Sequence, residues 1–272
     1  MLPMLLFVGL LMLLMLPIRS ISAVLFCFVA ASGSVKAGIQ AKAGFDDCPR
    51  FFLNAYLPKL PASAPGRQRQ LCFDAFAVLY SGQSKTPLYV VERLNKAQLA
   101  DASDEVRTNK FYEEARLPGA DRAHLADFKA RLDGEDARFD RGHMAPAADM
   151  PTARAMAQSF SLSNMVPQAP ANNRGPWARS VEKATRKYVM RAAGDVYVFT
   201  GPVYSAPLRT LGPGQVWIPA SLYKLVVDPS ANRAWAHWID NTDSARAGRP
   251  ISYEELVRRT GIDFLGTMRP GI

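Results

Sequence analysis

The chain of 272 residues is poor in the residue types that build several common kinds of site. It has three cysteines and three histidines, and no two cysteines form a C-x-x-C pair. This excludes zinc-ribbon and iron–sulfur frameworks. The sequence contains no internal repeat and no low-complexity tract, and its composition excludes collagen, coiled coils and outright disorder. With 49% apolar and 21% charged residues, the composition is typical of a globular protein with a substantial core.

Acidic residues are also in the minority. The chain has 33 Lys and Arg residues against 24 Asp and Glu residues, which gives a formal net charge of +9. A basic surface suits a polyanionic partner such as nucleic acid or an anionic lipid surface. Soluble proteins without such a partner can also be basic, so the charge alone does not decide the function.

The first 45 residues contain no acid, and their only basic residues are Arg19, Lys36 and Lys42. Counted from Met15, a short basic segment precedes the apolar run 21–31 and an A-x-A-like cleavage motif at 35–37. This pattern predicts a signal peptide over residues 1–37, with Met15 as the true start. The protein is then exported to the periplasm or the medium, without stable membrane insertion after cleavage. The alternative is an uncleaved N-terminal anchor.

Removal of this leader would remove Cys27 and leave only Cys48 and Cys72. Two cysteines in an exported chain favour one disulfide, here across 24 residues. Such a bond would stabilise the fold by about 3 kcal/mol in the chain-entropy model. Two unpaired buried thiols are the alternative. Because no linker divides the remainder, residues 38–272 are predicted to form a single domain.

The hydrophobic patterns predict a mixture of strands and helices. Strands are expected at 71–80, 87–91, 196–200, 216–218, 221–227 and 234–239. Helices are expected at 95–102, 120–132, 176–191 and 252–260, the last with Gly261 as its C-cap. Since the elements mix without βαβ regularity, the fold class is α+β, with a central, mostly antiparallel sheet flanked by helices.

Of the three histidines, His143 is the candidate for catalysis. It follows Asp140, Arg141 and Gly142 directly. An imidazole can take a proton from water near neutral pH, and the glycine permits a close backbone approach or a positive φ. His124 and His237 fall in a predicted helix and in an alternating strand, where a structural role is expected.

A second polar segment, Asn172-Asn173-Arg174-Gly175-Pro176-Trp177, lies about thirty residues further on. The carbonyl of an Asn side chain is a hard oxygen ligand that suits Mg²⁺. An Asn just before a helix is also a common N-cap, which is the structural alternative.

Together the Asp-Arg-Gly-His motif and the downstream Asn-x-Gly-x-Trp motif resemble the DNA/RNA non-specific endonuclease family. The resemblance extends over roughly residues 70–267 and includes the segments 91–94, 196–202 and 260–264. It implies a ββα-metal (His-Me finger) active site and metal-dependent hydrolysis of phosphodiester bonds in DNA and RNA. The implied cofactor is Mg²⁺, for which Mn²⁺ can substitute. The oligomeric state stays open, with a homodimer as one form.

The resemblance also implies a role for five residues. His143 matches the general base that activates the attacking water, and Asn173 matches the sole direct protein ligand of the metal. Arg141 matches the arginine of the motif, and Arg107 matches an upstream arginine that holds the phosphate. Glu182 matches the acid on the following helix, which orients water around the metal.

The position of Glu182 departs from the family pattern. In relatives the acid falls four residues after the tryptophan, whereas Glu182 falls five residues after Trp177. On an α-helix one residue corresponds to a rotation of about 100°. Either a bulge or a one-residue insertion absorbs this rotation, or Glu182 is a solvated surface residue and not the equivalent of the family's acid.

Three other functions remain open from the sequence. The first is a catalytically weak or idle nucleic-acid-binding relative that acts in DNA uptake. The second is a zinc-using nuclease of the HNH type, which needs further His or Cys ligands near His143. The third is a membrane-attached structural protein with a vestigial site.

Overall fold

The structure, a computed structural model, describes residues 44–130 and 138–271, which belong to one compact unit spanning Lys42–Ile272. The predicted leader, and with it Cys27, lies outside the described residues. Within the two described ranges, no helix is long and apolar enough to cross a membrane.

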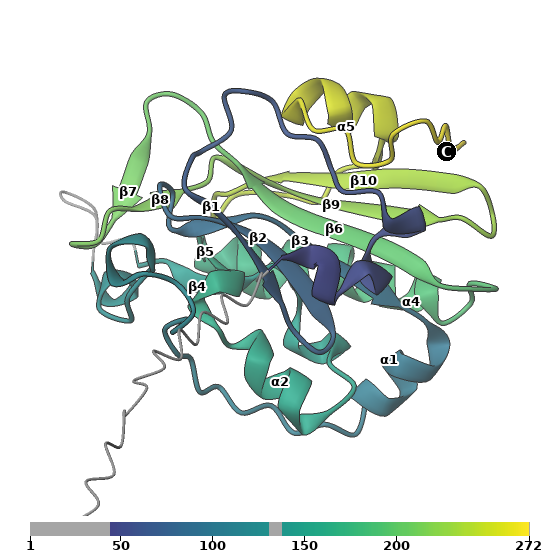
Figure 1. Ribbon diagram of the computed structural model, residues 1–272, viewed down its shortest axis with the longest axis horizontal. Helices are drawn as coiled ribbons and strands as arrows, with labels where there is room; N and C mark the ends of the chain where they lie inside the picture. Colours follow the sequence, from purple (N-terminus) through teal and green to yellow (C-terminus); the bar gives the residue numbers. More distant parts are fainter. Residues whose placement is uncertain (1–43, 131–137, 272) are drawn as a thin grey trace, which may run out of the picture. The chain divides into compact units, whose positions relative to one another are not determined.

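A seven-stranded sheet forms the centre of this unit (Figure 1). All of its strand pairs are antiparallel, in the order β1-β2-β3-β6-β9-β10-β11. The strands of this sheet are β1 (Gln68–Cys72), β2 (Phe76–Ser81), β3 (Thr86–Leu94), β6 (Val196–Val203), β9 (Ser221–Asp228), β10 (Arg233–Asp240) and β11 (Ile251–Ser252). Two small two-stranded sheets consist of β4 (Asp140–His143) with β5 (Met165–Gln168), and β7 (Arg209–Leu211) with β8 (Val216–Ile218).

The helices are short. The α-helices are α1 (Lys96–Ala102), α2 (Ala153–Ser159), α3 (Pro170–Asn172), α4 (Lys183–Val189) and α5 (Tyr253–Thr260). A π-helix, η8 (Asn173–Glu182), joins α3 to α4. Single 3₁₀ turns are η1 (Phe45–Asp47), η2 (Pro49–Phe51), η3 (Leu53–Ala55), η4 (Gly119–Asp121), η5 (Asp127–Lys129), η6 (Ala147–Asp149) and η7 (Leu162–Asn164).

The large sheet is buried on both faces because successive side chains of a strand point to opposite sides. In β2, Ala77 and Leu79 contribute to a core with Leu256 of α5, whereas Val78 and Tyr80 contribute to a core with Trp177 of η8. Figure 1 shows the same division, with α5 on one side of the sheet and α1, α2 and α4 on the other. The candidate site residues belong to the second side.

The predicted α+β class with a mostly antiparallel sheet is confirmed. Two of the predicted helices also form as their capping residues indicate. In α1, the Asn95 side chain accepts a hydrogen bond from the Gln98 N–H at 3.0 Å. In α5, Ser252 caps the first turn, and Gly261 ends the helix at a φ of 69°, in the left-handed region that favours glycine.

Two predicted strands have wrong boundaries. The run 71–80 is divided between β1 and β2, because residues 73–75 form a tight turn that the Phe73 N–H closes on the Phe76 carbonyl. The strand predicted to stop at Thr200 continues through Gly201-Pro202 to Val203. Pairing with β3 ends at Thr200, so the proline, which has no N–H, interrupts no bond to that strand.

The helix predicted over 120–132 is wrong. Within its described part the chain forms only the 3₁₀ turns η4 and η5. Carboxylates take up its backbone N–H groups: Glu113 accepts the Leu125 N–H at 2.9 Å, and Asp127 accepts the His124 N–H at 2.8 Å. Asp127 also holds the segment against the Gly214 N–H at 2.6 Å. These contacts between segments override the helical periodicity of the sequence.

The predicted disulfide between Cys48 and Cys72 is present. It joins the end of η1 to the last residue of β1. Cys48 is completely buried and packs in the core on the α5 side of the sheet. The bond therefore ties the N-terminal turns of the described chain to an edge strand.

Candidate active site

The centre of the site is a strand pair followed by a helix. In the pair, Gly142 lies opposite Val166, and His143 lies opposite Met165. A Cβ at Gly142 would overlap with the buried Gln168 side chain, so the motif glycine is needed for the close approach of β5, and its φ is not positive. From β5 the chain passes through α3 into η8 and α4.

The His143 ring packs against two phenyl rings, which also pack against each other with centroids 4.9 Å apart. Its centroid is 5.7 Å from that of Phe111 and 4.9 Å from that of Phe160. Each phenyl ring also carries a guanidinium group: Arg141 lies 4.0 Å from the Phe111 centroid, and Arg107 lies 5.0 Å from the Phe160 centroid. The rings therefore orient the imidazole and hold two positive charges beside it.

This environment leaves His143 neutral at physiological pH. Burial and the positive charges of Arg107 and Arg141 lower its pKa to about 3. Nε2 is buried without a hydrogen-bond partner, whereas the ring bonds to the backbone of Arg141. The nitrogen bonded to that backbone is therefore Nδ1, and the lone pair on Nε2 is free to accept a proton.

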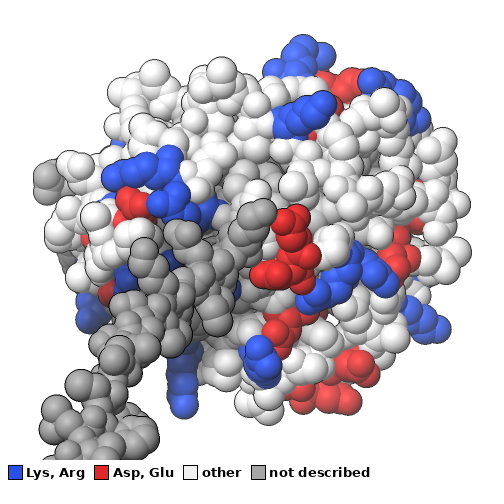
Figure 2. All heavy atoms as spheres, viewed as in Figure 1, with Lys and Arg blue, Asp and Glu red and all other residues white. Residues whose placement is uncertain are grey.

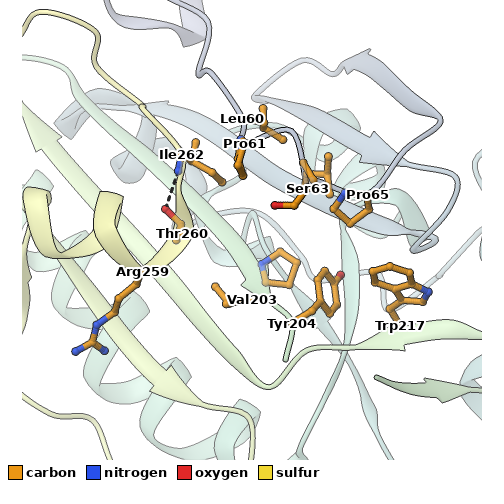
Figure 3. A pocket seen from close by; sticks show the side chains of 13 residues that line it. Leu60, Pro61, Ser63, Pro65, Val203, Tyr204, Trp217, Arg259, Thr260 and Ile262 are labelled. Carbon is orange, nitrogen blue, oxygen red and sulfur yellow. Dashed lines mark hydrogen bonds between the residues drawn. The ribbon is translucent and has the colours of Figure 1, made fainter. Parts of the chain in front are cut away.

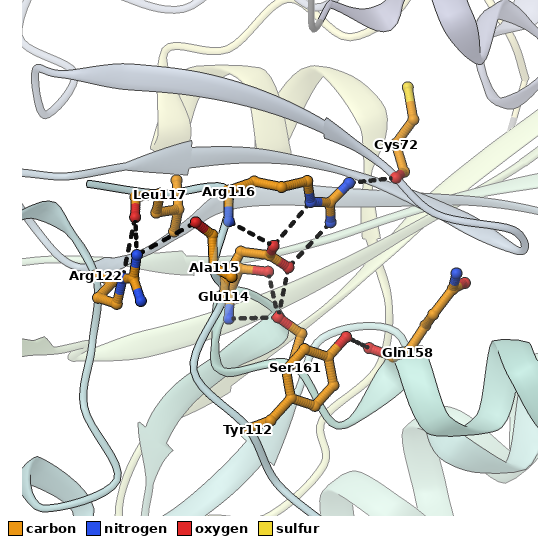
Figure 4. A network of polar contacts seen from close by, with 10 residues as sticks. Cys72, Tyr112, Glu114, Ala115, Arg116, Leu117, Arg122, Gln158 and Ser161 are labelled. Carbon is orange, nitrogen blue, oxygen red and sulfur yellow. Dashed lines mark hydrogen bonds and ion pairs between the residues drawn. The ribbon is translucent and has the colours of Figure 1, made fainter. Parts of the chain in front are cut away.

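The loop that carries Arg107 and Phe111 is anchored by a polar network (Figure 4). The buried carboxylate of Glu114 accepts hydrogen bonds from Arg116 at 2.8 and 3.0 Å and from the Ser161 hydroxyl at 3.1 Å. Arg116 also donates to the Cys72 carbonyl at 2.8 Å. Backbone hydrogen bonds of Tyr112 to Phe160 and from Leu162 complete the attachment. The network therefore fixes Phe111 and Phe160 as an edge-to-face pair against which the His143 ring packs.

Asn173 has its amide oriented by Asp140. The Nδ2 of Asn173 donates to Asp140 Oδ2 at 2.9 Å, so the carbonyl oxygen faces the other way and is available as a ligand. Arg174 holds the same carboxylate through two bonds of 2.8 and 2.6 Å. Asp140 is thus a site residue that the sequence analysis placed in the motif without giving it a role.

The neighbouring Asn172 has a different environment. It is fully buried, and its Nδ2 donates to the Asp240 carbonyl at 2.6 Å. Its side chain makes no capping hydrogen bond to the helix, so the N-cap interpretation is wrong for this residue, and it does not face solvent. Its contact instead attaches the start of the helix to the end of β10.

A π-helix explains the position of Glu182. At the end of η8 the Lys183 N–H bonds to the Ala178 carbonyl five residues back, and near its start Gly175 departs from helical geometry, with φ −105° and ψ −108°. Nine residues separate Asn173 from Glu182, which on an α-helix would place them about 180° apart. The wider π turn and the break at Gly175 both depart from this α-helical spacing. Asn173 and Glu182 line the same hollow, and of the alternatives left open by the sequence, the bulge is the one present.

Burial raises the pKa of Glu182 to about 7, because the charged form is desolvated. The positive charge of Lys224 opposes this shift, and the negative charge of Asp149 adds to it. A cation in the pocket would favour the ionised carboxylate further.

All five residues predicted from the sequence line one hollow of about 190 Å³: Arg107, Arg141, His143, Asn173 and Glu182. Its oxygen donors are an amide carbonyl and a carboxylate, which suit Mg²⁺ better than a softer metal. In the described part of the chain, no group of three or more His, Cys, Asp or Glu could hold a metal ion. The ligands expected of a zinc-using HNH nuclease are therefore not found there.

Figure 3 shows a second hollow, which lies between the segment Leu60–Pro65 and the aromatic residues Tyr204 and Trp217. None of the five predicted residues lines it. Its only basic residue, Arg259, is paired with Glu255 at 2.5 Å. On the face drawn in Figure 2, basic and acidic side chains are interspersed. Neither feature offers a rival catalytic centre.

Phe160 is a site residue that the sequence analysis missed. It contacts both His143 and Arg107, yet it lies seventeen residues after His143, at the end of α2. As a single aromatic residue at a helix end it carries no motif. Only the packing of α2 against the large sheet brings it to the site.

The strand pair, the helix that follows it and the pocket together define a nuclease of the ββα-metal fold. Comparison with known proteins agrees. The family model for DNA/RNA non-specific endonucleases matches residues 54–269. The chain belongs to this family, whose members are metal-dependent nucleases acting on nucleic acids.

Named relatives include Nuclease C1 of Cunninghamella echinulata var. echinulata, 32% identical over 186 residues that cover 64% of this chain and 71% of the relative. A nuclease of Nostoc sp. is 28% identical and covers 73% and 74% of the two chains. Human mitochondrial endonuclease G is 29% identical and covers 60% and 56%. A solved EndoG/EndoGI complex has the same fold, with a TM-score of 0.65 and 22% identity over 75% of this chain and 89% of that one.

Proposed function

We propose that this protein hydrolyses phosphodiester bonds within DNA and RNA, with His143 as the general base and one Mg²⁺ ion as the cofactor. The observation that carries the proposal is the single hollow in which His143, Asn173, Glu182 and two arginines meet. An idle nucleic-acid-binding relative would need neither the free Nε2 of His143 nor the oriented amide of Asn173.

The proton transfer follows from the environment of His143. Its Nε2 takes a proton from the attacking water, whose oxygen forms the new bond to phosphorus. Because Nδ1 is held by the Arg141 backbone, the tautomer is fixed before the substrate arrives. A bound phosphodiester brings negative charge next to Arg107 and Arg141, which offsets their effect and raises the basicity of the imidazole.

The two arginines supply the charge that a phosphoryl group requires. Arg107 and Arg141 both line the hollow and are held by the phenyl rings beneath them. Their N–H donors stabilise the negative oxygens of the phosphate as the bond to the leaving oxygen breaks. Products with a 5′-phosphate and a 3′-hydroxyl are expected from the family resemblance.

Asn173 and Glu182 are suited to hold the cofactor. Asn173 would bind Mg²⁺ through its carbonyl oxygen, and Glu182 would accept hydrogen bonds from the surrounding water. The chemistry that Mg²⁺ supplies when bound is Lewis-acid stabilisation of the phosphate and of the departing 3′-oxygen. Asp140 keeps the carbonyl of Asn173 directed away from itself.

The substrate range can be tested with purified protein and Mg²⁺. Plasmid, linear DNA, single-stranded DNA and RNA are incubated with and without EDTA. We expect cleavage of all four, because contacts to phosphates carry no base specificity, and loss of cleavage with EDTA. Binding of the nucleic acids without Mg²⁺-dependent cleavage would instead indicate the idle relative.

We also propose that the chain is exported, with residues 1–37 removed and residues 38–272 forming one nuclease domain. The Cys48–Cys72 disulfide supports this proposal, since such bonds persist in oxidising compartments. N-terminal sequencing of the protein recovered from the producing cells tests it. A start near residue 38 is expected, whereas an intact N-terminus would favour the uncleaved anchor.

A further inference from the structure

Lys224 is a charged residue in the middle of the sheet, with a relative exposure of 1%. Its ammonium group donates to Thr200 Oγ1 at 2.6 Å and to the Met144 carbonyl at 3.5 Å. It also lies 5.9 Å from the centre of the Trp177 ring. Burying an ammonium group is costly unless its surroundings compensate for the lost water, so a lysine at this position requires an explanation.

The contacts of Lys224 reach both halves of the active site. Met144 directly follows His143, so the bond to its carbonyl supports the strand that carries the base. Trp177 is buried in η8, the helix that carries Asn173 and Glu182. In the sheet, Lys224 lies opposite Thr200 of β6, which holds the ammonium group from the neighbouring strand. One side chain of β9 therefore contacts both segments, which are also linked to each other by the bonds of Asp140 to Asn173 and Arg174.

The carboxyl groups of Glu92 and Glu182 both lie close enough to Lys224 for its charge to act on them. Glu92 of β3 is 1% exposed, and neither of its oxygens has a hydrogen-bond partner. Its burial raises the pKa of this carboxyl well above the usual range, and the charge of Lys224 opposes that rise, as it does for Glu182. Lys224 and Arg186 are thus the two positive charges that act on these carboxyl groups.

We propose that Lys224 is a positioning residue of the nuclease site, which sets the distance between the His143 strand and the Asn173–Glu182 helix. The inference rests on the proposed function, because the groups that it positions are those assigned to the base and the metal. Lys224 itself is not among the residues that line the hollow.

The test is Lys224→Met, which keeps the length of the side chain and removes the charge and the donors. Cleavage of a defined DNA duplex is measured over ranges of DNA and Mg²⁺ concentration, and rates are expressed per folded molecule from the near-UV circular dichroism. We expect kcat to fall about ten- to a hundredfold, the size of effect that small displacements of catalytic groups produce. The half-saturating Mg²⁺ concentration should rise, and KM for DNA should stay within about twofold, since the arginines are untouched.

Two further variants serve as a control and as a second test of the proposal. His237→Leu changes the residue opposite Lys224 on β10, which has no part in either half of the site, and should leave kcat and the Mg²⁺ requirement unchanged. Thr200→Val removes only the acceptor that holds the ammonium group and should lower kcat by a smaller factor. It provides the answer if Lys224→Met does not fold.

A wild-type kcat per folded molecule in Lys224→Met, or in Thr200→Val where the first variant is unfolded, would overturn the proposal. Equal losses in His237→Leu would also overturn it, because they would indicate a general effect of altering the sheet. Failure of the proposed function is recognised separately: there, His143→Ala would cleave as fast as the wild type, or the wild type would not cleave at all.

Discussion

At the scale of single residues, the adjacent side chains Asn172 and Asn173 have the same chemistry but differ in burial and in hydrogen-bond partners. Asn172 is fully buried and bonds to the end of β10, whereas Asn173 lines the hollow with its carbonyl free. The Asn-x-Gly-x-Trp motif selects Asn173 in the sequence. The structure supplies a physical basis for that choice in the contact with Asp140.

Asn173→Ala should therefore abolish Mg²⁺-dependent cleavage or raise the required Mg²⁺ concentration strongly, with little change in stability. Asn172→Ala should lower the free energy of unfolding by about 1–3 kcal/mol, the cost of breaking a buried hydrogen bond, with the Mg²⁺ requirement unchanged. A metal titration on plasmid DNA and chemical denaturation of both variants are the measurements. The reverse assignment of the two effects would show that the register of the metal ligand is off by one residue.

His237 gives the protein an acid-sensitive contribution to stability. Burial and the charge of Lys224 lower its pKa to about 4, against about 6.5 for the free side chain. Between these values the unfolded chain binds the proton and the folded chain does not, so the free energy of unfolding falls as the pH drops from 6.5 toward 4. Above pH 6.5 the histidine is neutral in both the folded and the unfolded chain, so it no longer makes the free energy of unfolding depend on pH.

We expect His237→Gln to lose about 1–2 kcal/mol less than the wild type when the pH is lowered from 7 to 5. Urea denaturation at both pH values measures this difference. Because His143 and the carboxylates titrate in both proteins, the comparison isolates His237. Identical losses in the two proteins would mean that His237 is not held neutral.

At the scale of elements, how well the sequence predicts the fold depends on whether an element is determined locally. Helices α1 and α5 are capped by their own Asn95, Ser252 and Gly261, and both were predicted. The helix predicted over 120–132 is not formed, since its backbone bonds to Glu113 and Asp127 contacts Gly214. The short strands β4 and β5 were not predicted, because four residues are too few to show a period.

The residues of the site likewise divide into those that local sequence identifies and those that only tertiary contacts identify. Five of the residues that line the hollow could be named from the sequence, through its motifs and the family resemblance that they carry. Phe160, Asp140 and Lys224 could not be given a role, because their contacts to the site depend on tertiary packing. Glu182 is an intermediate case: the sequence showed the extra residue, and only the structure shows that a π-helix accommodates it.

The wide turn of η8 can be tested by deleting Ser180, an exposed residue within it. Eight residues would then separate Asn173 from Glu182, and an ordinary α-helix places such residues about 80° apart, still on one side. We expect a folded protein whose cleavage rate is within about tenfold of the wild type, because a π turn absorbs one residue without rotating the helix beyond it.

The matched control is deletion of Ala184, an exposed residue in the regular helix α4. There no wide turn can absorb the change, and the following buried residues rotate by about 100°. The melting temperature of this control should fall far more than that of the Ser180 deletion. Equal losses in both variants would contradict the role given to the π-helix.

At the scale of the whole molecule, the disulfide attaches the N-terminal turns to the sheet. Because Cys48 and Cys72 close a 24-residue separation, Cys48→Ala/Cys72→Ala should lower the free energy of unfolding by about 3 kcal/mol. Intact mass after alkylation in denaturant, with and without reductant, establishes the bond. Two thiols that alkylate without reductant would show that the protein lacks it.

The net charge of +9 and the arginine-lined hollow are consistent with a polyanionic substrate. Substrate binding through phosphates depends strongly on salt, because each neutralised phosphate releases counterions. The same contacts do not discriminate between bases, which agrees with membership of a non-specific nuclease family.

The measurement that tests the central claim most directly is the single-turnover rate of DNA cleavage by His143→Ala in saturating Mg²⁺, with the wild type beside it. Loss of a general base typically costs about 10²–10⁴-fold in rate, and we predict a loss in this range with an unchanged melting temperature and unchanged DNA affinity. A folded His143→Ala protein that cleaves at the wild-type rate would contradict the account.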